Sequence, residues 1–248
     1  MKFPNLKSLL GLALLMGSVC LFSMNASAST VGLLQIDSGS GSVTVGLTSV
    51  DWLPPVGGGS GTFVVGAGTT LTSALGSPVA GSTGTVLDLS AGTVLPLANF
   101  MTFTTVPGLA FDLGFVGPGA ANTNCAALAI GGSCSIYAGS PFILTLTPTG
   151  TGVILAVGGI VRDGTTPSNW IGNFTTPIAG MTPLQIQQTF GCVAGQGPAA
   201  CTNPTATINS TYAGQFIATV TPVPEPTSIG LMGLGLIGLF CIRKKIAA

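Results

Sequence analysis

Four cysteines are the side chains whose type and spacing point most directly to chemistry. They form two segments of equal spacing, CAALAIGGSC from Cys125 to Cys134 and CVAGQGPAAC from Cys192 to Cys201. Cysteines placed in this way either bind a metal ion or oxidise to disulfides. Zinc sites usually show closer Cys-x-x-Cys pairs or accompanying histidines, and the chain has no histidine. We therefore predict two local disulfides, Cys125–Cys134 and Cys192–Cys201, and no metal site, with the other pairings open in principle.

The residue types that most enzymes use for acid–base or nucleophilic catalysis are scarce. Without histidine the usual general base is absent, and residues 29–223 contain no lysine that could activate a serine. Asp37 lies in QIDSGSG, which has the apolar-Asp-Ser-Gly order found around the catalytic aspartates of aspartic proteases. Such enzymes need two carboxylates that share a proton, and the chain has no second copy of the motif. We therefore expect no catalytic residue and interpret Asp37 as the cap of a turn.

Other motifs carry less weight. GLGLIG, residues 233–238, has the Gly-x-Gly-x-x-Gly order of a dinucleotide-binding turn, but it lies in an apolar run without a strand-turn-helix pattern. RDG, residues 162–164, offers one carboxylate at a turn, whereas calcium needs several oxygen ligands. We expect no cofactor. The sequons at Asn173 and Asn209 matter only in a host that glycosylates them.

The elements that must position these side chains are short strands. Runs rich in Val, Ile, Phe and Thr are separated by Gly, Pro, Ser and Asn roughly every eight to twelve residues, which is typical of an all-β fold. We expect strands in residues 30–36, 42–53, 61–67, 84–90, 99–106, 108–116, 141–150, 151–164, 169–176, 205–212 and 214–223. Polar and apolar residues alternate in several of them, which favours half-buried antiparallel strands. We predict an antiparallel β-sandwich of the jelly-roll or Ig-like kind.

One segment favours a helix instead. In MTPLQIQQTFG, residues 181–191, Thr182 is a good N-cap, Pro183 suits the first helical position and Gly191 is a stop signal. The sequence therefore predicts a short helix just before the second cysteine segment. The residues expected to share one face of it are Leu184, Gln187 and Gln188.

The first 28 residues have the three parts of a secretory signal peptide. A basic start and an apolar run over residues 9–22 precede Ala26-Ser27-Ala28, a small-x-small cleavage site. We predict that signal peptidase cuts after Ala28. The chain then divides into a signal peptide (1–28), a secreted β domain (29–221) and a C-terminal segment (222–248).

The predicted mature body is almost without charge. Arg162 is its one cation, against five aspartates, which gives a net charge of −4 over residues 29–223. Such a body cannot neutralise a row of phosphates, so we exclude nucleic acid as a partner. Thr, Ser, Gly and Asn must form the solvated face, which suits a secreted protein among neutral polymers. The aspartates are Asp37, Asp51, Asp88, Asp112 and Asp163.

The C-terminal segment has three parts in order. Pro224-Glu225-Pro226 comes first, residues 229–242 follow without a charge, and Arg243-Lys244-Lys245 comes last. As a helix the apolar run would span about 21 Å, short of the roughly 30 Å hydrocarbon core, so crossing needs flanking residues and snorkelling cations. The cations would stay in the cytoplasm while the signal peptide sends the body out. We predict a transmembrane helix here.

These three parts resemble the PEP-CTERM sorting signal of Gram-negative bacteria. The resemblance covers about 26 residues, 223–248. In that family an exosortase, a Cys-dependent transpeptidase-like enzyme, recognises the signal at the membrane, and the proteins are linked to exopolysaccharide production and biofilm or cell-surface assembly. The resemblance implies exosortase as a partner, a transient or permanent membrane anchor, and a final place at the outer surface or in the extracellular matrix. It implies no known activity for the body.

Together these features predict a non-enzymatic exported protein with a structural or adhesive role in exopolysaccharide or biofilm, and exopolysaccharide as a candidate partner. The first alternative is a secreted carbohydrate-binding module, which would show a row of exposed aromatic residues on one face. A less favoured alternative is an acid protease that takes its second aspartate from another chain. The aromatic residues available for a platform are Trp52, Trp170, Tyr137, Tyr212 and the phenylalanines.

Overall fold

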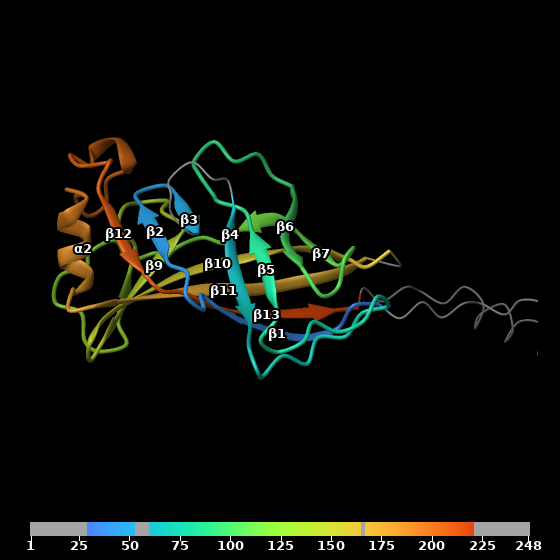
Figure 1. Ribbon diagram of the computed structural model, residues 1–248. Coiled ribbons are helices and arrows are strands. Elements are labelled where there is room, and N and C mark those ends of the chain that lie inside the picture. Colours follow the sequence, from blue (N-terminus) through green and yellow to red (C-terminus); the bar gives the residue numbers. More distant parts are fainter. Residues whose placement is uncertain (1–28, 53–59, 165–166, 221–248) are drawn as a thin grey trace, which may run out of the picture.

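A computed structural model describes residues 29–52, 60–164 and 167–220 (Figure 1). The predicted signal peptide, with Ala26 and Ala28, lies outside the described residues. So do the predicted transmembrane helix and Pro224-Glu225-Pro226. Within the described ranges no helix is long and apolar enough to cross a membrane.

The described chain is built mainly from strands, with one α-helix and one 3-10 turn. The helix is α2 (Pro183–Thr189), and the 3-10 turn, η1 (Pro198–Ala200), lies inside the second cysteine segment. The strands are β1 (Gly32–Asp37), β2 (Val43–Gly46), β3 (Val50–Trp52), β4 (Gly61–Val65), β5 (Thr83–Val86), β6 (Leu97–Phe103), β7 (Ala110–Val116), β8 (Ser133–Cys134), β9 (Phe142–Thr147), β10 (Gly150–Arg162), β11 (Ser168–Ala179), β12 (Thr207–Ser210) and β13 (Ala213–Thr219).

Eight antiparallel strands form a closed barrel, in the order β11-β13-β1-β4-β5-β6-β7-β10. The ring closes because β10 also pairs with β11, over the register from Gly150↔Ala179 to Val161↔Ser168. The pairing of β10 with β7 shifts register between Gly158 and Gly159, where β7 carries Gly114 as an extra residue. A Cβ on Gly159 would lie 2.0 Å from the carbonyl oxygen of Asp112, so this close approach of two backbones requires glycine.

The long hairpin of β10 and β11 belongs both to the barrel and to the sheet that extends beyond it. It runs the length of the molecule in Figure 1. The second half of β10 pairs with β7 in the barrel, while its first half, Gly150–Leu155, pairs with β9, and β9 pairs with β8. The hairpin therefore extends beyond the barrel as a flat platform at the end of the molecule where α2 lies.

A separate three-stranded sheet, β12-β2-β3, packs on that platform. Two of its strands are continuous with barrel strands, because β1 leads into β2 and β12 leads into β13. Where these segments leave the barrel, the Ser38 amide donates to the Tyr212 carbonyl at 2.9 Å. Side chains of the two layers meet in the core of this region. Those from the small sheet are Val45, Val50 and Trp52, and those from the hairpin are Val153, Leu155 and Phe174.

The all-β class and the single short helix are confirmed, but the sandwich is wrong as a description of the main body. Two-layer packing is confined to the end where β12-β2-β3 covers the platform. Elsewhere the sheet closes on itself, which leaves no open edge to cover. The predicted strand at 42–53 is also two strands, β2 and β3, because the chain turns between them and the Gly46 amide donates to the Ser49 carbonyl at 2.9 Å.

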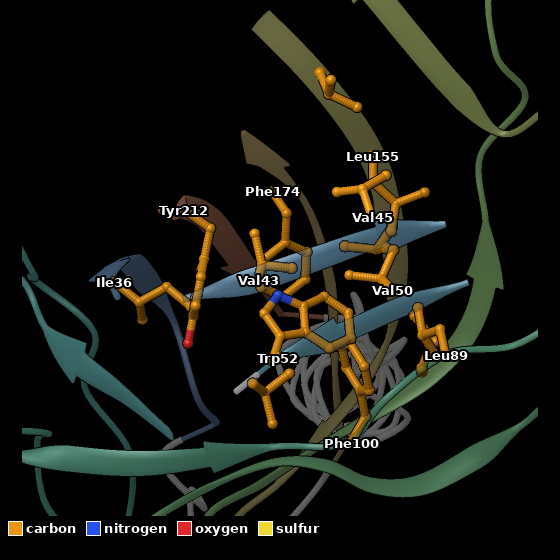
Figure 2. Close-up of a cluster of buried hydrophobic side chains, with 14 of the residues drawn as sticks. Ile36, Val43, Val45, Val50, Trp52, Leu89, Phe100, Leu155, Phe174 and Tyr212 are labelled. Atoms are coloured by element: carbon orange, nitrogen blue, oxygen red, sulfur yellow. The ribbon is translucent and has the colours of Figure 1, made fainter. Parts of the chain in front are cut away.

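Aromatic residues fill the core where the two parts meet. Figure 2 shows the Trp52 indole reaching from β3 toward Phe100 and Phe174, with ring centroids 5.8 and 4.9 Å away. Deeper in the barrel, Trp170 stacks on Phe100 with the ring planes 7° apart. These rings join barrel and small sheet into one hydrophobic core.

Helix α2 begins and ends as the sequence predicts. Thr182 is its N-cap and forms a capping box with Gln185, Pro183 opens the helix, and it ends before Gly191, whose φ is +64°. Of the three residues predicted to share one face, Gln187 is buried and Leu184 packs against the core, whereas Gln188 is exposed. The buried residues are Pro183, Ile186 and Gln187, because the apolar Ile186 and not the polar Gln188 turns toward the core.

Candidate functional site

Both predicted disulfides are present in the structure. Cys125 bonds to Cys134 and Cys192 bonds to Cys201, with Cα atoms 5.3 and 4.1 Å apart. Each bond closes a loop with a sequence separation of nine residues. The local pairing is therefore confirmed, as is expected for a body that folds in an oxidising compartment.

Hydrogen bonds join the segments that flank the first disulfide loop to α2 and to the second loop. The side-chain amide of Gln187 in α2 donates to the carbonyls of Thr123 and Ile136, at 2.9 and 2.8 Å. The Gly195 amide donates to the Thr123 hydroxyl at 2.8 Å, and the Ala138 amide donates to a carbonyl of the second loop at 2.8 Å. We call this unit, residues 122–142 and 183–203, the disulfide cap.

The disulfide cap borders a groove of about 690 Å³. Tyr137 and Pro198 come from the cap, and the opposite side is the β2–β3 turn with the segment around residue 90. The lining is largely apolar, with Val50, Leu89, Val116, Phe142 and Leu155, and hydroxyl groups from Thr48, Ser49 and Ser90 supply its polar side chains. None of the lining residues carries a charge at neutral pH.

Tyr137 is the only lining residue of this groove that can titrate. Burial raises the pKa of its phenol, and a hydrogen bond with Ser140 only partly offsets that effect. The phenol therefore stays protonated at neutral pH and provides an O–H group rather than a base. The groove can bind an uncharged, partly apolar ligand with hydroxyl contacts, but its side chains offer no general base for catalysis.

The aspartates are distributed over separate structural tasks. Asp37 is exposed at the end of β1, and its carboxylate accepts the Gly39 amide at 2.8 Å, which is the turn cap that the sequence predicts. Asp88 accepts the amide of Trp52 at 2.9 Å. Asp163, from the RDG segment, is buried and accepts the Thr30 hydroxyl and the Ala74 amide, both at 2.9 Å.

Asp112 pairs with Arg162 across β7 and β10. The guanidinium donates to both carboxylate oxygens at 2.5 and 2.8 Å, and the Asn99 amide donates to the same carboxylate at 2.8 Å. Burial alone would raise the pKa of Asp112, but the hydrogen bonds from Arg162 and Asn99 and the charge of Arg162 together hold that pKa below its usual value. This bidentate pair links two neighbouring strands of the barrel.

We expect Arg162→Gln to weaken the fold near neutral pH and to change its response to acid. Because the folded pKa of Asp112 is depressed, its contribution is present above the unfolded pKa of about 4 and is lost as pH falls through the folded pKa. Arg162 is 46% exposed, so the cost should be about 1 kcal/mol or less. Urea unfolding at pH 7 and pH 3 would measure this. Parallel pH profiles for the wild type and the variant would contradict it.

Loss of either disulfide should lower the free energy of unfolding by more than Arg162→Gln does. Replacing both cysteines of one pair with alanine is expected to lower the free energy of unfolding by about 2.5–3 kcal/mol, because a closed loop of this size restricts the unfolded chain. Denaturant unfolding of the two paired variants, with the oxidised wild type as reference, would measure this. A variant pair as stable as the wild type would contradict the structural role of that bond.

The aromatic residues that the sequence offers for a sugar-binding platform lie inside the protein. Trp52, Trp170, Tyr137 and Tyr212 are each at most 5% exposed. Tyr212 uses its hydroxyl to bond the Thr62 carbonyl at 2.7 Å. Of the aromatic side chains in the described residues, Phe115, 48% exposed, is the one among the exposed large hydrophobic residues. The described surface therefore offers no row of exposed aromatics.

Sequence reasoning did not find the groove. Its side chains come from the β2–β3 turn, the segment after β5, the end of β7, residues 137–142 beyond the first disulfide loop, β10 and the second disulfide loop, and no motif marks any of them. Only the cysteines gave a signal, since their equal spacing predicted that residues 125–134 and 192–201 form closed loops.

Comparison with protein families bears on the other end of the chain. The family model of the PEP-CTERM protein-sorting motif matches residues 222–245. The chain carries a PEP-CTERM sorting motif. The match includes Pro224, Glu225 and Pro226 as well as Arg243, Lys244 and Lys245, and it directly follows the described body. The PEP-CTERM motif implies an exported protein that is processed by an exosortase and anchored at a membrane.

The PEP-CTERM motif accounts for sorting and leaves the body unassigned. No curated protein and no solved structure matches the chain. What the barrel, the small sheet and the disulfide cap do must therefore be argued from their own geometry.

Proposed function

We propose that this protein is a non-enzymatic structural or adhesive component of the cell surface or extracellular matrix of a Gram-negative bacterium. An exosortase would sort it after signal peptidase has removed residues 1–28. The observation that carries the proposal is the PEP-CTERM motif at residues 222–245, following a body that contains two disulfides.

The chemistry of the surface supports a place among neutral polymers such as exopolysaccharide. Across β4, β5 and β6, Thr62, Thr85 and Thr102 lie side by side in register. The hydroxyls of Thr85 and Thr102 are 2.6 Å apart, and the same wall also carries Thr83 and Thr104. An uncharged surface of hydroxyl groups can exchange hydrogen bonds with a glycan without attracting ionic partners.

The groove beside the disulfide cap is the place where such a polymer could bind. Its hydroxyl and apolar lining matches the two faces of an uncharged sugar chain, and the two disulfides hold its cap in place before binding. This role makes use of the same surface chemistry as adhesion and needs no exposed aromatic platform.

The test of the proposal is the intact mass of the protein from its native host, in membrane and extracellular fractions. We expect a C-terminus near Pro224–Thr227 in the extracellular or surface fraction. Reduction should add about four protons, from two disulfides. An intact tail in every fraction would make the protein a plain membrane-anchored one and would overturn the sorting pathway.

A further inference from the structure

One wall of the barrel carries an apolar row that nothing in the described structure covers. Leu33, Ile217 and Ile171 are direct neighbours on β1, β13 and β11. The row continues through Gly158 on β10 to Phe115 on β7. Side chains opposite one another in antiparallel strands point to the same face, so these residues form one surface over five adjacent strands. Ile171 is 60% exposed, Ile217 51% and Phe115 48%.

The row is a built surface rather than a scatter of single residues. A Cβ on Gly158 would lie 2.5 Å from the ring of Phe115, so the ring lies over this glycine. The row borders a shallow groove of about 460 Å³, which Ile154 and Ala156 of β10 also line, and no residue that lines it is charged. Asn173 and Gln215 add uncharged polar groups to the lining. An exposed apolar row of this kind can mark a contact.

The opposite wall has different chemistry. In the ring order, β5 is four strands from β11 in either direction. β5 and its two neighbours carry the hydroxyl row of Thr62, Thr85 and Thr102. The barrel is therefore amphipathic around its circumference, with an apolar wall centred on β13 and β11 and a hydroxyl wall centred on β5.

The position of the sorting motif indicates what covers the apolar wall. The motif begins at residue 222, five residues after Ile217, and Val220 between them is also exposed at 51%. Eight residues, 221–228, separate the described body from the uncharged run that starts at residue 229. Fully extended they would reach about 27 Å, so anchoring keeps the wall within reach of the lipid surface. A tether of this length raises the effective concentration of the wall at that surface.

We propose that the apolar wall lies on the bilayer that holds the sorting motif, with Ile171, Ile217 and Phe115 at the boundary between headgroups and acyl chains. This rests on the proposed function, in which the sorting motif anchors the protein at a membrane before its tail is removed. With five aspartates and one arginine in the body, the attraction is apolar rather than electrostatic, so zwitterionic lipid suffices. The hydroxyl wall then faces away from the membrane. Because the wall alone binds weakly, removal of the tail releases the body.

The experiment places a tryptophan on each wall of the full chain. Ile171→Trp and, as matched control, Thr85→Trp are reconstituted in phosphatidylcholine vesicles with and without bromine on the acyl chains. The native Trp52 and Trp170 are 1% exposed and give the same background in both variants. Flotation of the vesicles reports anchoring separately. We expect bromolipid to quench the Ile171→Trp emission and to leave the Thr85→Trp emission unchanged.

A further variant tests whether the row itself makes the contact. Adding Phe115→Asp and Ile217→Asp to Ile171→Trp should abolish the quenching while the protein still floats and keeps its circular dichroism spectrum. Equal quenching of both probes, or no quenching of Ile171→Trp in floating protein, would overturn the wall contact and leave anchoring intact. An unquenched Ile171→Trp in a dimer would assign the wall to a second copy instead. Failure to float would overturn the anchoring, and the proposal with it.

Discussion

Replacing Pro224, Glu225 and Pro226 with alanine is expected to abolish processing of the C-terminal segment. This tripeptide lies within the PEP-CTERM sorting motif at residues 222–245. Each proline fixes its own φ and lacks a backbone N–H, so the sequence predicts an extended tripeptide that an enzyme can bind. Alanine removes both restraints and the acidic group. The variant should keep its full mass and remain in the membrane fraction of the native host.

The matched control is Thr221→Ala, which lies just outside the matched residues. It should be processed like the wild type. The triple-alanine variant should also unfold at the same denaturant concentration as the wild type, because the changed residues are not among the described strands of the barrel. A triple-alanine variant whose tail is still removed would show that recognition depends on the apolar run or the cations alone.

The sequence predicts most strands of this fold because their local pattern is strong. In β11, Trp170 and Phe174 point inward while Asn169 and Thr175 lie on the outer side. This arrangement appears in the sequence as apolar residues interleaved with polar ones. The same strand also carries the exposed Ile171, and β13 carries the exposed Ile217. Because these strands carry apolar residues on both faces, the alternation of polar and apolar residues is incomplete. The sequence alone therefore does not distinguish the apolar residues of the outer wall from those of the core.

Barrel closure could not be predicted from local pattern. It depends on β10 pairing with β7 on one side and with β11 on the other, and on the long-range pairing of β1 with β13. A sandwich and a barrel use the same short alternating strands, and they differ in which edges meet. The register between β10 and β7 also shifts at Gly158/Gly159, but a pair of glycines in a strand does not reveal its partner.

The candidate sites also differ in how far the sequence alone predicts them. The disulfides could be predicted because each pair is local in sequence, and the sorting motif because its three parts are contiguous. The groove and the apolar wall could not, because Ser49 and Tyr137, or Leu33 and Phe115, meet only after the strands have paired. In this chain, therefore, motifs that are contiguous in sequence predict the sorting pathway. The surfaces for which we propose binding roles form only through tertiary contacts.

Trp170→Ala is expected to destabilise the body more than any single surface change. The indole is 1% exposed, contacts Phe111 and Phe216 with centroids 5.4 and 5.7 Å away, and donates to the Asp112 carbonyl at 3.0 Å. Removing it leaves a cavity between β11, β7 and β13, so we expect a loss of about 3–5 kcal/mol in the free energy of unfolding. Urea unfolding followed by circular dichroism would measure it.

Ile171→Ala is the matched control, because it is the next residue of the same strand and points outward, 60% exposed. In solution it should change the free energy of unfolding by about 0.5 kcal/mol or less. Trp170→Phe should fall between the two, since it keeps a ring in the core but loses the hydrogen bond to Asp112. If Ile171→Ala cost more than Trp170→Ala, the register of β11 would be shifted by one residue. The apolar wall would then be wrong, because such a shift exchanges every inward and outward side chain of the strand.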